Sequence, residues 1–209
     1  LKALGFETVR VLSHGDSVDF GTGGRVTAAP FFGEDPTQLE YGANTYVLIQ
    51  DQQAALVHVD SGTNLQGESM VTSGDCAQLV SQFGPLNPIF ATRRQERGTM
   101  VEHTWEYLLQ TTKAWVAPTE NCCNTAEFLA QLCNASQSKH LVLYSEGGAS
   151  YYPIGTDFLR GETPKALDEA YEFGWDSLDT IREAVTAQHT QVIRATPGQR
   201  YQIGQGPVQ

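Results

Sequence analysis

The stretch that decides the fold begins with RVTAAP at residues 25–30, continues with FFGEDP at residues 31–36 and ends with ALVHVDSG at residues 55–62. Two of its β-forming runs lead directly to a carboxylate in a glycine-containing turn, Glu34 after the first run and Asp60 after the last. A sheet fixes the backbone at a strand end while the following loop leaves the side chain free, so strand ends often hold catalytic groups and metal ligands. Both carboxylates are therefore candidate metal ligands.

Each candidate also has a simpler interpretation. Glu34 could be an exposed turn residue in an acidic chain, and the adjacent Asp35 could take its role if the register shifts by one residue. Asp60 could be a turn or cap residue, although its place after an apolar strand favours a ligand. His58 and Asp60 are two apart on one strand and share a face, so both could approach one ion. A hydrogen bond from His58 to a neighbour in the sheet is the more common arrangement.

Composition sets the class of protein and excludes several partners. The chain has 209 residues with 40% hydrophobic content, which suits one globular domain. No apolar run reaches the roughly 18 residues that span a bilayer, and the start at Leu1 is neither a signal peptide nor an initiator methionine, so we expect a piece of a longer protein. The net charge of −11, with 13 Lys plus Arg, would repel phosphates. We expect neither nucleic acid nor a membrane as partner.

The four cysteines, Cys76, Cys122, Cys123 and Cys133, contain no Cys-x-x-Cys spacing. A zinc knuckle is not indicated, and adjacent cysteines make a poor disulfide framework. We expect reduced thiols and a cytoplasmic location.

The order of predicted elements is strand pairs first, then alternating helices and strands, which predicts an α+β fold with mixed sheets flanked by helices. Turn residues and β-rich runs predict the strands, and apolar residues at helical spacing predict the helices. A frayed tail is expected from Gly204 onward. The strands are expected at 8–12, 17–20, 25–29, 44–50, 54–59, 88–92, 141–144 and 191–195, and the helices after Asp75, around 101–109, after Asn124 and after Thr163.

The runs at 44–49 and 55–62 resemble a hairpin of metallo-β-lactamase-fold domains, especially their lactonase-like branch. The resemblance implies a metallo-β-lactamase-like αββα sandwich, classed as α/β (α+β), of which residues 1–209 form the C-terminal portion. In that family an aspartate at the position of Asp60 bridges two metal ions. The family signature His-x-His-x-Asp-His does not occur in this chain. The remaining metal ligands are therefore expected N-terminal to Leu1.

Glu34 occupies a place where hydrolases of this fold usually have histidine. A carboxylate makes the site harder and more anionic, which favours iron over zinc. Glu34 and Asp60 together resemble the diiron β-hydroxylase family of the chloramphenicol pathway, which belongs to antibiotic biosynthesis. The resemblance implies a non-haem diiron monooxygenase that hydroxylates the β-carbon of an amino acid held on a nonribosomal peptide synthetase carrier protein. Glu34 would bind one of two iron ions, Asp60 would bridge both, and an external donor would supply electrons; a homodimer is compatible with this.

Two other functions stay open. One is a metal-dependent hydrolase of the same superfamily, which would use zinc or manganese to cleave a lactone, phosphoester or thioester. The other is a domain that has lost its metals and serves as a binding module. The basic run at 93–97 could receive the phosphate of a phosphopantetheine arm, although salt bridges with Glu96 and Glu102 are slightly favoured.

Overall fold

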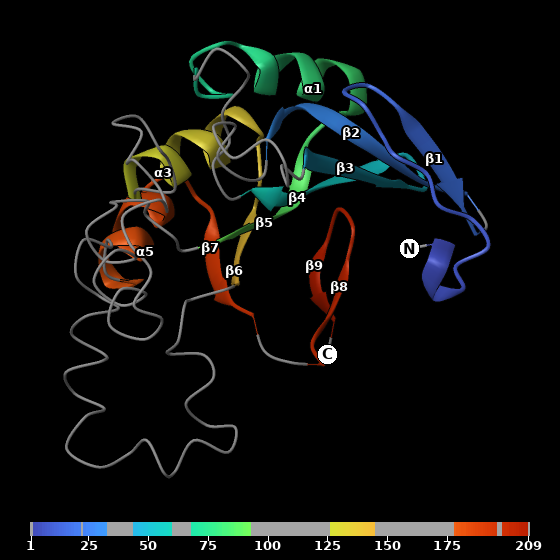
Figure 1. Cartoon of the computed structure of the whole chain (residues 1–209). Helices are drawn as coiled ribbons and strands as arrows, with labels where there is room; N and C mark the ends of the chain where they lie inside the picture. Colours follow the sequence, from blue (N-terminus) through green and yellow to red (C-terminus); the bar gives the residue numbers. More distant parts are fainter. Residues whose placement is uncertain are drawn as a thin grey trace, which may run out of the picture.

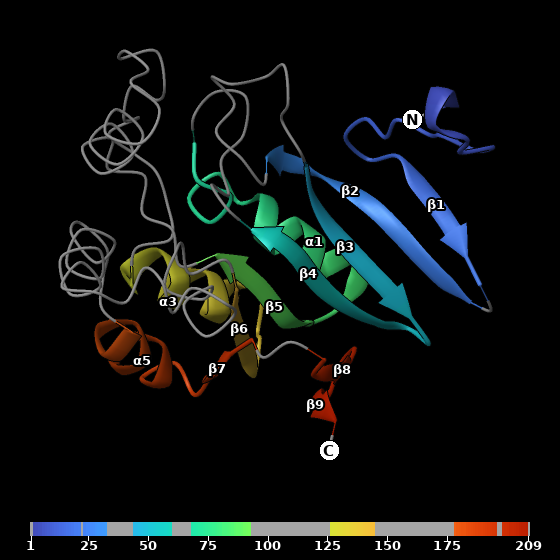
Figure 2. The same ribbon diagram turned by 60° about the horizontal axis from the view of Figure 1, so that its bottom comes forward.

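The computed structural model of the protein describes residues 2–21, 23–32, 44–59, 68–92, 126–144, 178–195 and 198–208. Within these ranges a mixed β-sheet carries α-helices on one face and a small β-hairpin on the other, as Figures 1 and 2 show. The fold is α+β, as the order of elements predicts.

The large sheet contains seven strands that lie side by side in chain order. The strands from β1 to β4 pair antiparallel, and those from β4 to β7 pair parallel. Parallel neighbours cannot be joined by a tight turn, so the chain must cross over between them. The strands are β1 (Ser17–Phe20), β2 (Gly24–Phe32), β3 (Asn44–Gln50), β4 (Gln53–Val59), β5 (Leu86–Thr92), β6 (His140–Tyr144) and β7 (Gln191–Arg194).

The turn between β3 and β4 fixes the register of the central hairpin. Asp51 and Gln52 have φ angles of 51° and 63°, the left-handed values of a two-residue type I′ turn. The turn pairs Gln50 with Gln53 and, further along, Tyr46 with Val57. The hairpin predicted at this polar segment is thereby confirmed.

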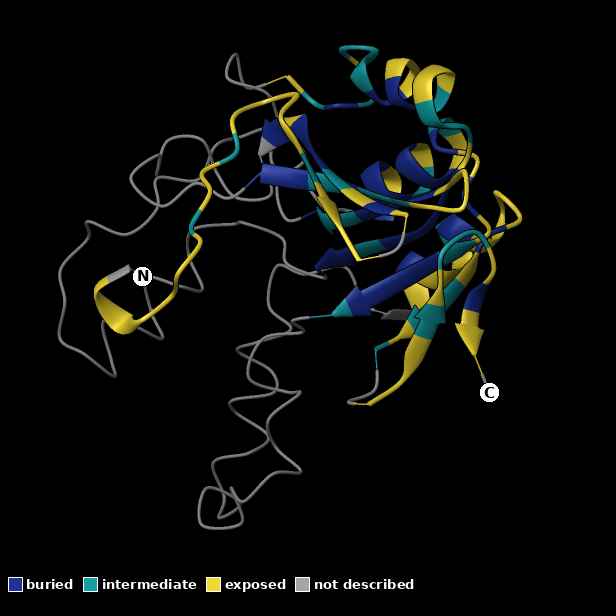
Figure 3. Ribbon diagram, turned by 90° about the vertical axis from the view of Figure 1, so that its right-hand side faces the viewer, coloured by how far each residue is buried: buried dark blue, intermediate teal, exposed yellow. Residues whose placement is uncertain are grey.

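The helices cover one face of the sheet with apolar side chains. Leu129, Leu132 and Ile181 are fully buried in the same cluster as Leu56 and Ile89 of the sheet. Each such side chain contributes about 1.5–3 kcal/mol of hydrophobic stabilisation. Figure 3 shows buried residues along the strands and the inner faces of the helices. The helices are η1 (Lys2–Leu4, a 3₁₀ turn), α1 (Asp75–Phe83), α3 (Ala126–Ala135) and α5 (Leu178–Thr186).

A second, two-stranded sheet is formed by β8 (Arg200–Gln202) and β9 (Gly206–Val208). The hairpin packs against the face of the large sheet that the helices leave open, where the ring of Tyr201 meets Phe90 edge-on at 5.1 Å. The Gly204 N–H donates to the carbonyl of Asn87 (2.6 Å). The predicted frayed tail is therefore wrong, because glycines with left-handed φ angles close the turn and β5 anchors it.

Other predicted boundaries changed for local reasons. The expected strand at 8–12 is irregular, with Val11 90% exposed, because β1 pairs with β2 and leaves this segment without a ladder. Strand β2 runs past its predicted end through Pro30, which is exposed and lies where the β2–β3 register shifts. Such an irregularity tolerates the missing N–H of proline. The expected helix around 101–109 and the start of the one after 163 lie outside the described residues.

Cys76 and Cys133 are free, buried thiols. Burial raises the pKa of both thiols to about 12, so both stay protonated and act as apolar core groups. Cys122 and Cys123 lie outside the described ranges. No helix within those ranges has the length and apolar character needed to cross a bilayer.

Candidate functional site

The parallel strands and β2 run in one direction, so their carboxyl ends share one edge of the sheet. This carboxyl edge is defined by Phe32, Val59, Thr92 and Tyr144, the last residues of β2, β4, β5 and β6. Figure 2 shows the arrowheads of β2 and β4 directed to the same side, with β3 running the other way between them. In sheets of this kind, ligands commonly bind outside the carboxyl ends of the strands.

The ends of β2 and β4 are level with each other. Phe32 pairs with Asn44 at the start of β3, and Tyr46 pairs with Val57 on the other side of β3. Two strand spacings separate β2 from β4, which is roughly 10 Å. Glu34 and Asp60 follow these strand ends by two residues and one residue and lie outside the described residues. The segments that follow β2 and β4 therefore leave the sheet at neighbouring points of the carboxyl edge.

His58, next to the end of β4, has a left-handed backbone with a φ angle of 62°. Leu56 pairs with Ile89 and Val59 pairs with Ala91, so three steps on β4 face two on β5. This mismatch is a β-bulge, a feature that re-aims a side chain and recurs beside active sites. A left-handed conformation costs a non-glycine residue about 1–2 kcal/mol. The bulge thus places a strained histidine at the carboxyl edge.

Two hydrogen bonds hold His58 in this conformation. Its ring Nδ1 lies 3.2 Å from the hydroxyl of Tyr144, and its carbonyl accepts a hydrogen bond from the hydroxyl of Thr45 (3.1 Å). Thr45 is fully buried, so its hydroxyl is a fixed donor. The hydrogen bond predicted between His58 and a neighbour in the sheet is confirmed, with Tyr144 as the partner. Tyr144 lies 86 residues further along the chain, and no local sequence signal connects the two.

The other ring nitrogen of His58, Nε2, is buried and has no hydrogen-bond partner among the described residues. Buried polar atoms are nearly always paired, so an unpaired one calls for a missing water, ion or ligand. A neutral imidazole whose Nδ1 donates a hydrogen bond presents a free lone pair on Nε2, which is the usual arrangement of a metal-binding histidine. This nitrogen fits a metal ion at the carboxyl edge, although the described ranges hold no cluster of three potential ligands.

The carboxyl edge is also tied to the segment that precedes β1. His14 Nε2 lies 3.1 Å from the side-chain oxygen of Asn44, and the Asn44 amide donates to the carbonyl of Leu12 (3.3 Å). Asn44 is 9% exposed and starts β3 between the ends of β2 and β4. These contacts give His14 a structural task at the edge.

The opposite edge, where β5 and β6 begin, is organised around Asn87. We call this the amino edge. Here the side-chain oxygen of Asn87 accepts hydrogen bonds from the N–H groups of Lys139 and His140, both at 3.0 Å, and from the hydroxyl of Ser138 at 3.2 Å. Asn87 is 4% exposed, and its amide nitrogen has no partner within the described ranges. Burial, with a smaller effect of Lys139, lowers the pKa of His140.

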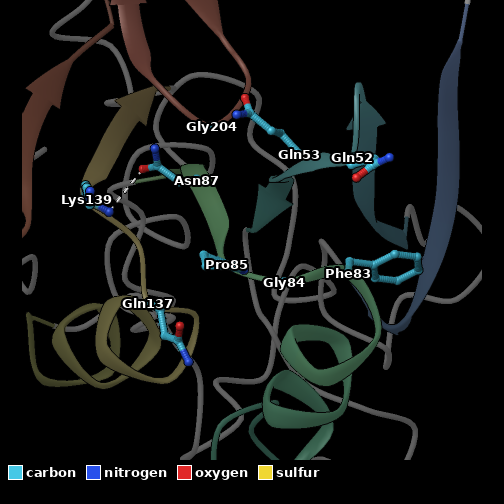
Figure 4. Close-up of a pocket in the computed structure, with 9 residues that line it drawn as sticks. All are labelled: Gln52, Gln53, Phe83, Gly84, Pro85, Asn87, Gln137, Lys139 and Gly204. Atoms are coloured by element: carbon cyan, nitrogen blue, oxygen red, sulfur yellow. Dashed lines mark hydrogen bonds between the residues drawn. The ribbon is translucent and has the colours of Figure 1, made fainter.

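A cavity of about 440 Å³ opens at the amino edge (Figure 4). It is lined by the amides of Gln52, Gln53 and Asn87, by the ring of Pro85 and by Lys139. Its walls come from the β3–β4 turn, the start of β5 and the loop before β6. The cavity therefore lies at the opposite end of the strands from the predicted ligands.

No protein-family model matches the chain, and no curated protein matches it. Its fold is similar to that of CmlA, a diiron β-hydroxylase from Streptomyces venezuelae, with a TM-score of 0.54 and 14% identity over 93% of this chain and 34% of CmlA. A glutamate-to-aspartate variant of CmlA gives a TM-score of 0.56 and 15% identity over the same shares. A protein from Parabacteroides distasonis, provisionally named a metal-dependent hydrolase, aligns with a TM-score of 0.43 and 14% identity over 92% of this chain and 59% of its own.

The chain spans about a third of the length of CmlA, 34%, and the likeness extends over nearly all of the chain. At these identities the likeness shows the fold alone. The protein has a metallo-β-lactamase-like α+β fold, which confirms the predicted fold class.

Proposed function

We propose that this chain is part of a non-haem diiron monooxygenase that hydroxylates the β-carbon of an amino acid tethered to a nonribosomal peptide synthetase carrier protein. The observation that carries the proposal is the carboxyl edge, where β2 and β4 end level with each other and lead to Glu34 and Asp60. The strained His58, with its unpaired buried nitrogen, lies at the same edge. The fold shared with CmlA, which is a diiron β-hydroxylase, supports this choice among metalloenzymes.

Glu34 and Asp60 are the carboxylates that would hold the ions. Anionic oxygen ligands favour iron over softer metals. The iron pair, when bound, supplies the binding and reduction of O₂ and the oxidation of an unactivated C–H bond. We propose that the His-x-His-x-Asp-His motif of such a site lies N-terminal to Leu1.

The described residues fix the end of β4, which Asp60 follows in the sequence. The Thr45 hydroxyl holds the carbonyl of His58, and the Tyr144 hydroxyl holds its ring, so the end of β4 is tied on both sides. A site works only when its supporting residues hold the reactive groups to a fraction of an ångström. Tyr46 and Val57, which pair across β3 and β4 near this edge, are half-buried.

The reaction inserts one oxygen atom of O₂ into the C–H bond and reduces the other to water, which consumes two electrons and two protons. An external electron donor must supply the electrons. The basic run at 93–97 follows the end of β5 at the carboxyl edge and lies outside the described residues. We propose that it receives the phosphate of the carrier protein's phosphopantetheine arm.

The test uses the natural full-length protein, purified without added metal, and an aminoacyl-carrier protein. We expect two iron ions per chain by elemental analysis, and transfer of one oxygen atom from isotopically labelled O₂ to the β-carbon when a reductant is present. Zinc or manganese with cleavage of a thioester or lactone would instead identify a hydrolase. A protein without stoichiometric metal would refute both metalloenzyme functions and favour the binding module.

A further inference from the structure

We propose that His58 binds one of the metal ions directly through Nε2, and that Tyr144 is the positioning residue that orients its ring. The inference rests on the proposed function, because it requires a metal ion at the carboxyl edge. The juxtaposition that carries it is a strained, tied histidine with an unpaired buried nitrogen, two residues before the predicted bridging Asp60.

The backbone gives the first argument. The bulge inserts His58 between Leu56 and Val59, which keep their pairing with β5. A glycine would adopt the same φ angle of 62° without strain, so a histidine at this position is kept at a cost in stability. Strained residues cluster at active sites and ligand-binding positions, because the surrounding structure enforces a geometry that the local chain disfavours.

The side chain gives the second, independent argument. If His58 served only to hydrogen-bond Tyr144, its Nε2 would remain buried without a partner, as it is among the described residues. That arrangement adds the desolvation of a ring nitrogen to the strain of the backbone. A metal ion at Nε2 removes the cost of desolvation, because the lone pair of the nitrogen then forms a bond to the metal. Nδ1 must then carry the proton, which makes the Tyr144 hydroxyl its acceptor.

The contact between His58 and Tyr144 matches a common arrangement of metal-binding histidines. Such a histidine usually donates its other ring N–H to an oxygen, which fixes the tautomer and the direction of the ring. The Nδ1 to Tyr144 distance of 3.2 Å fits this outer contact. Residues two apart on a strand are roughly 6.6 Å apart along the chain, close enough for two ligands to reach one ion.

The test compares His58→Gln and Tyr144→Phe with the wild-type full-length protein. Fe²⁺ affinity is measured by competition with a chromophoric chelator. Histidine coordination is read by pulsed EPR on protein that carries nitrogen-isotope-labelled histidine. We expect His58→Gln to weaken one Fe²⁺ site by more than about 100-fold and to remove one histidine-nitrogen coupling. Tyr144→Phe should weaken the same site by about 10- to 100-fold, the range for a residue that orients a metal ligand, and keep the coupling.

Three results distinguish the assignment of His58 as a ligand from the proposed function. Unchanged affinity and coupling in His58→Gln would overturn the ligand assignment, while wild-type iron content would leave the proposed function standing. Weaker binding with the coupling retained would show that His58 acts outside the coordination sphere, which also overturns it. A wild-type protein without iron would fail the proposed function itself. Circular dichroism of the metal-free variants checks folding, and His58→Gly, which suits the left-handed backbone, replaces His58→Gln if that variant misfolds.

Discussion

The amino edge and the carboxyl edge of the sheet each contain a buried polar side chain, but the two side chains are used differently. At the amino edge, Asn87 accepts hydrogen bonds from two main-chain N–H groups, of Lys139 and His140, and the β8–β9 hairpin closes over it. At the carboxyl edge, His58 bonds one hydroxyl through its ring and occupies a strained backbone conformation. Each edge leaves one buried nitrogen unpaired within the described ranges.

The two residues differ in their other contacts and in the strain of their backbone. The unpaired amide nitrogen of Asn87 belongs to a side chain whose oxygen satisfies main-chain groups that would otherwise lack an acceptor. Stability therefore explains the contacts of the Asn87 side-chain oxygen. For His58, backbone strain adds to the unpaired nitrogen, and stability does not explain it. The comparison teaches that the amino edge holds the sheet together, whereas the carboxyl edge carries backbone strain, which we attribute to the proposed metal site.

The sharpest way to break this contrast is to remove the predicted bridging carboxylate. Asp60→Asn should lose at least one of two iron ions and more than about 100-fold in hydroxylation rate, since even supporting residues around a metal cost 10–100-fold. Elemental analysis and turnover measure the two effects. Asp51→Asn is the matched control, because Asp51 lies in the β3–β4 turn at the other end of the strands, where asparagine is equally suited. Retention of two irons in Asp60→Asn would argue strongly against the carboxyl edge as the site.

A second substitution tests the structural role of Asn87 at the amino edge. Asn87→Ala leaves the N–H groups of Lys139 and His140 without their acceptor and should lower the free energy of unfolding by about 2–4 kcal/mol. Metal content should not change. Urea unfolding checks the first statement, with Asn134→Ala on the exposed side of α3 as a control expected within about 0.5 kcal/mol of wild type. A stable Asn87→Ala variant that loses metal would reverse the roles of the edges.

These contrasts also mark how far sequence reasoning reaches. Strands β3 to β7 and helix α1 were predictable because alternation, turn residues and helical spacing agree locally with the fold. The bulge at His58 depends on pairing with β5, and its contact with Tyr144 spans 86 residues, so neither leaves a local pattern. The β8–β9 hairpin likewise depends on its contact with Asn87. Glu34 and Asp60, which lie outside the described residues, remain predictions of the sequence alone.

A smaller effect would sharpen the claim that His58 is strained. His58→Gly should be more stable than His58→Ala by about 1 kcal/mol, because both remove the side chain but glycine alone relaxes at a φ angle of 62°. Ordinary strand positions show the opposite sign. Ala55→Gly, in the same strand, should therefore lose at least about 0.5–1 kcal/mol. Urea unfolding of the metal-free variants measures the three values, and a less stable glycine at position 58 would remove the strain argument.

The smallest expected effect concerns pH at the amino edge. The pKa of His140 is lowered in the folded protein, so between its ordinary value of about 6.5 and that lower value the unfolded chain binds more protons. His140 therefore makes stability fall as the pH drops below about 6.5. The unfolding midpoint of His140→Gln should fall less steeply from pH 7.5 to pH 5.5 than that of the wild type, whatever the offset between the two curves. Parallel curves would show that His140 does not titrate differently on folding.

The most direct test of the account is the position of the metal. Crystals of the iron-loaded full-length protein, measured on both sides of the iron absorption edge, would locate the ions by anomalous scattering. We predict two iron peaks at the carboxyl edge, bound by Glu34 and Asp60, with one peak bonded to His58 Nε2. Iron at the amino edge, or Glu34 and Asp60 facing solvent far apart with no iron between them, would contradict the account.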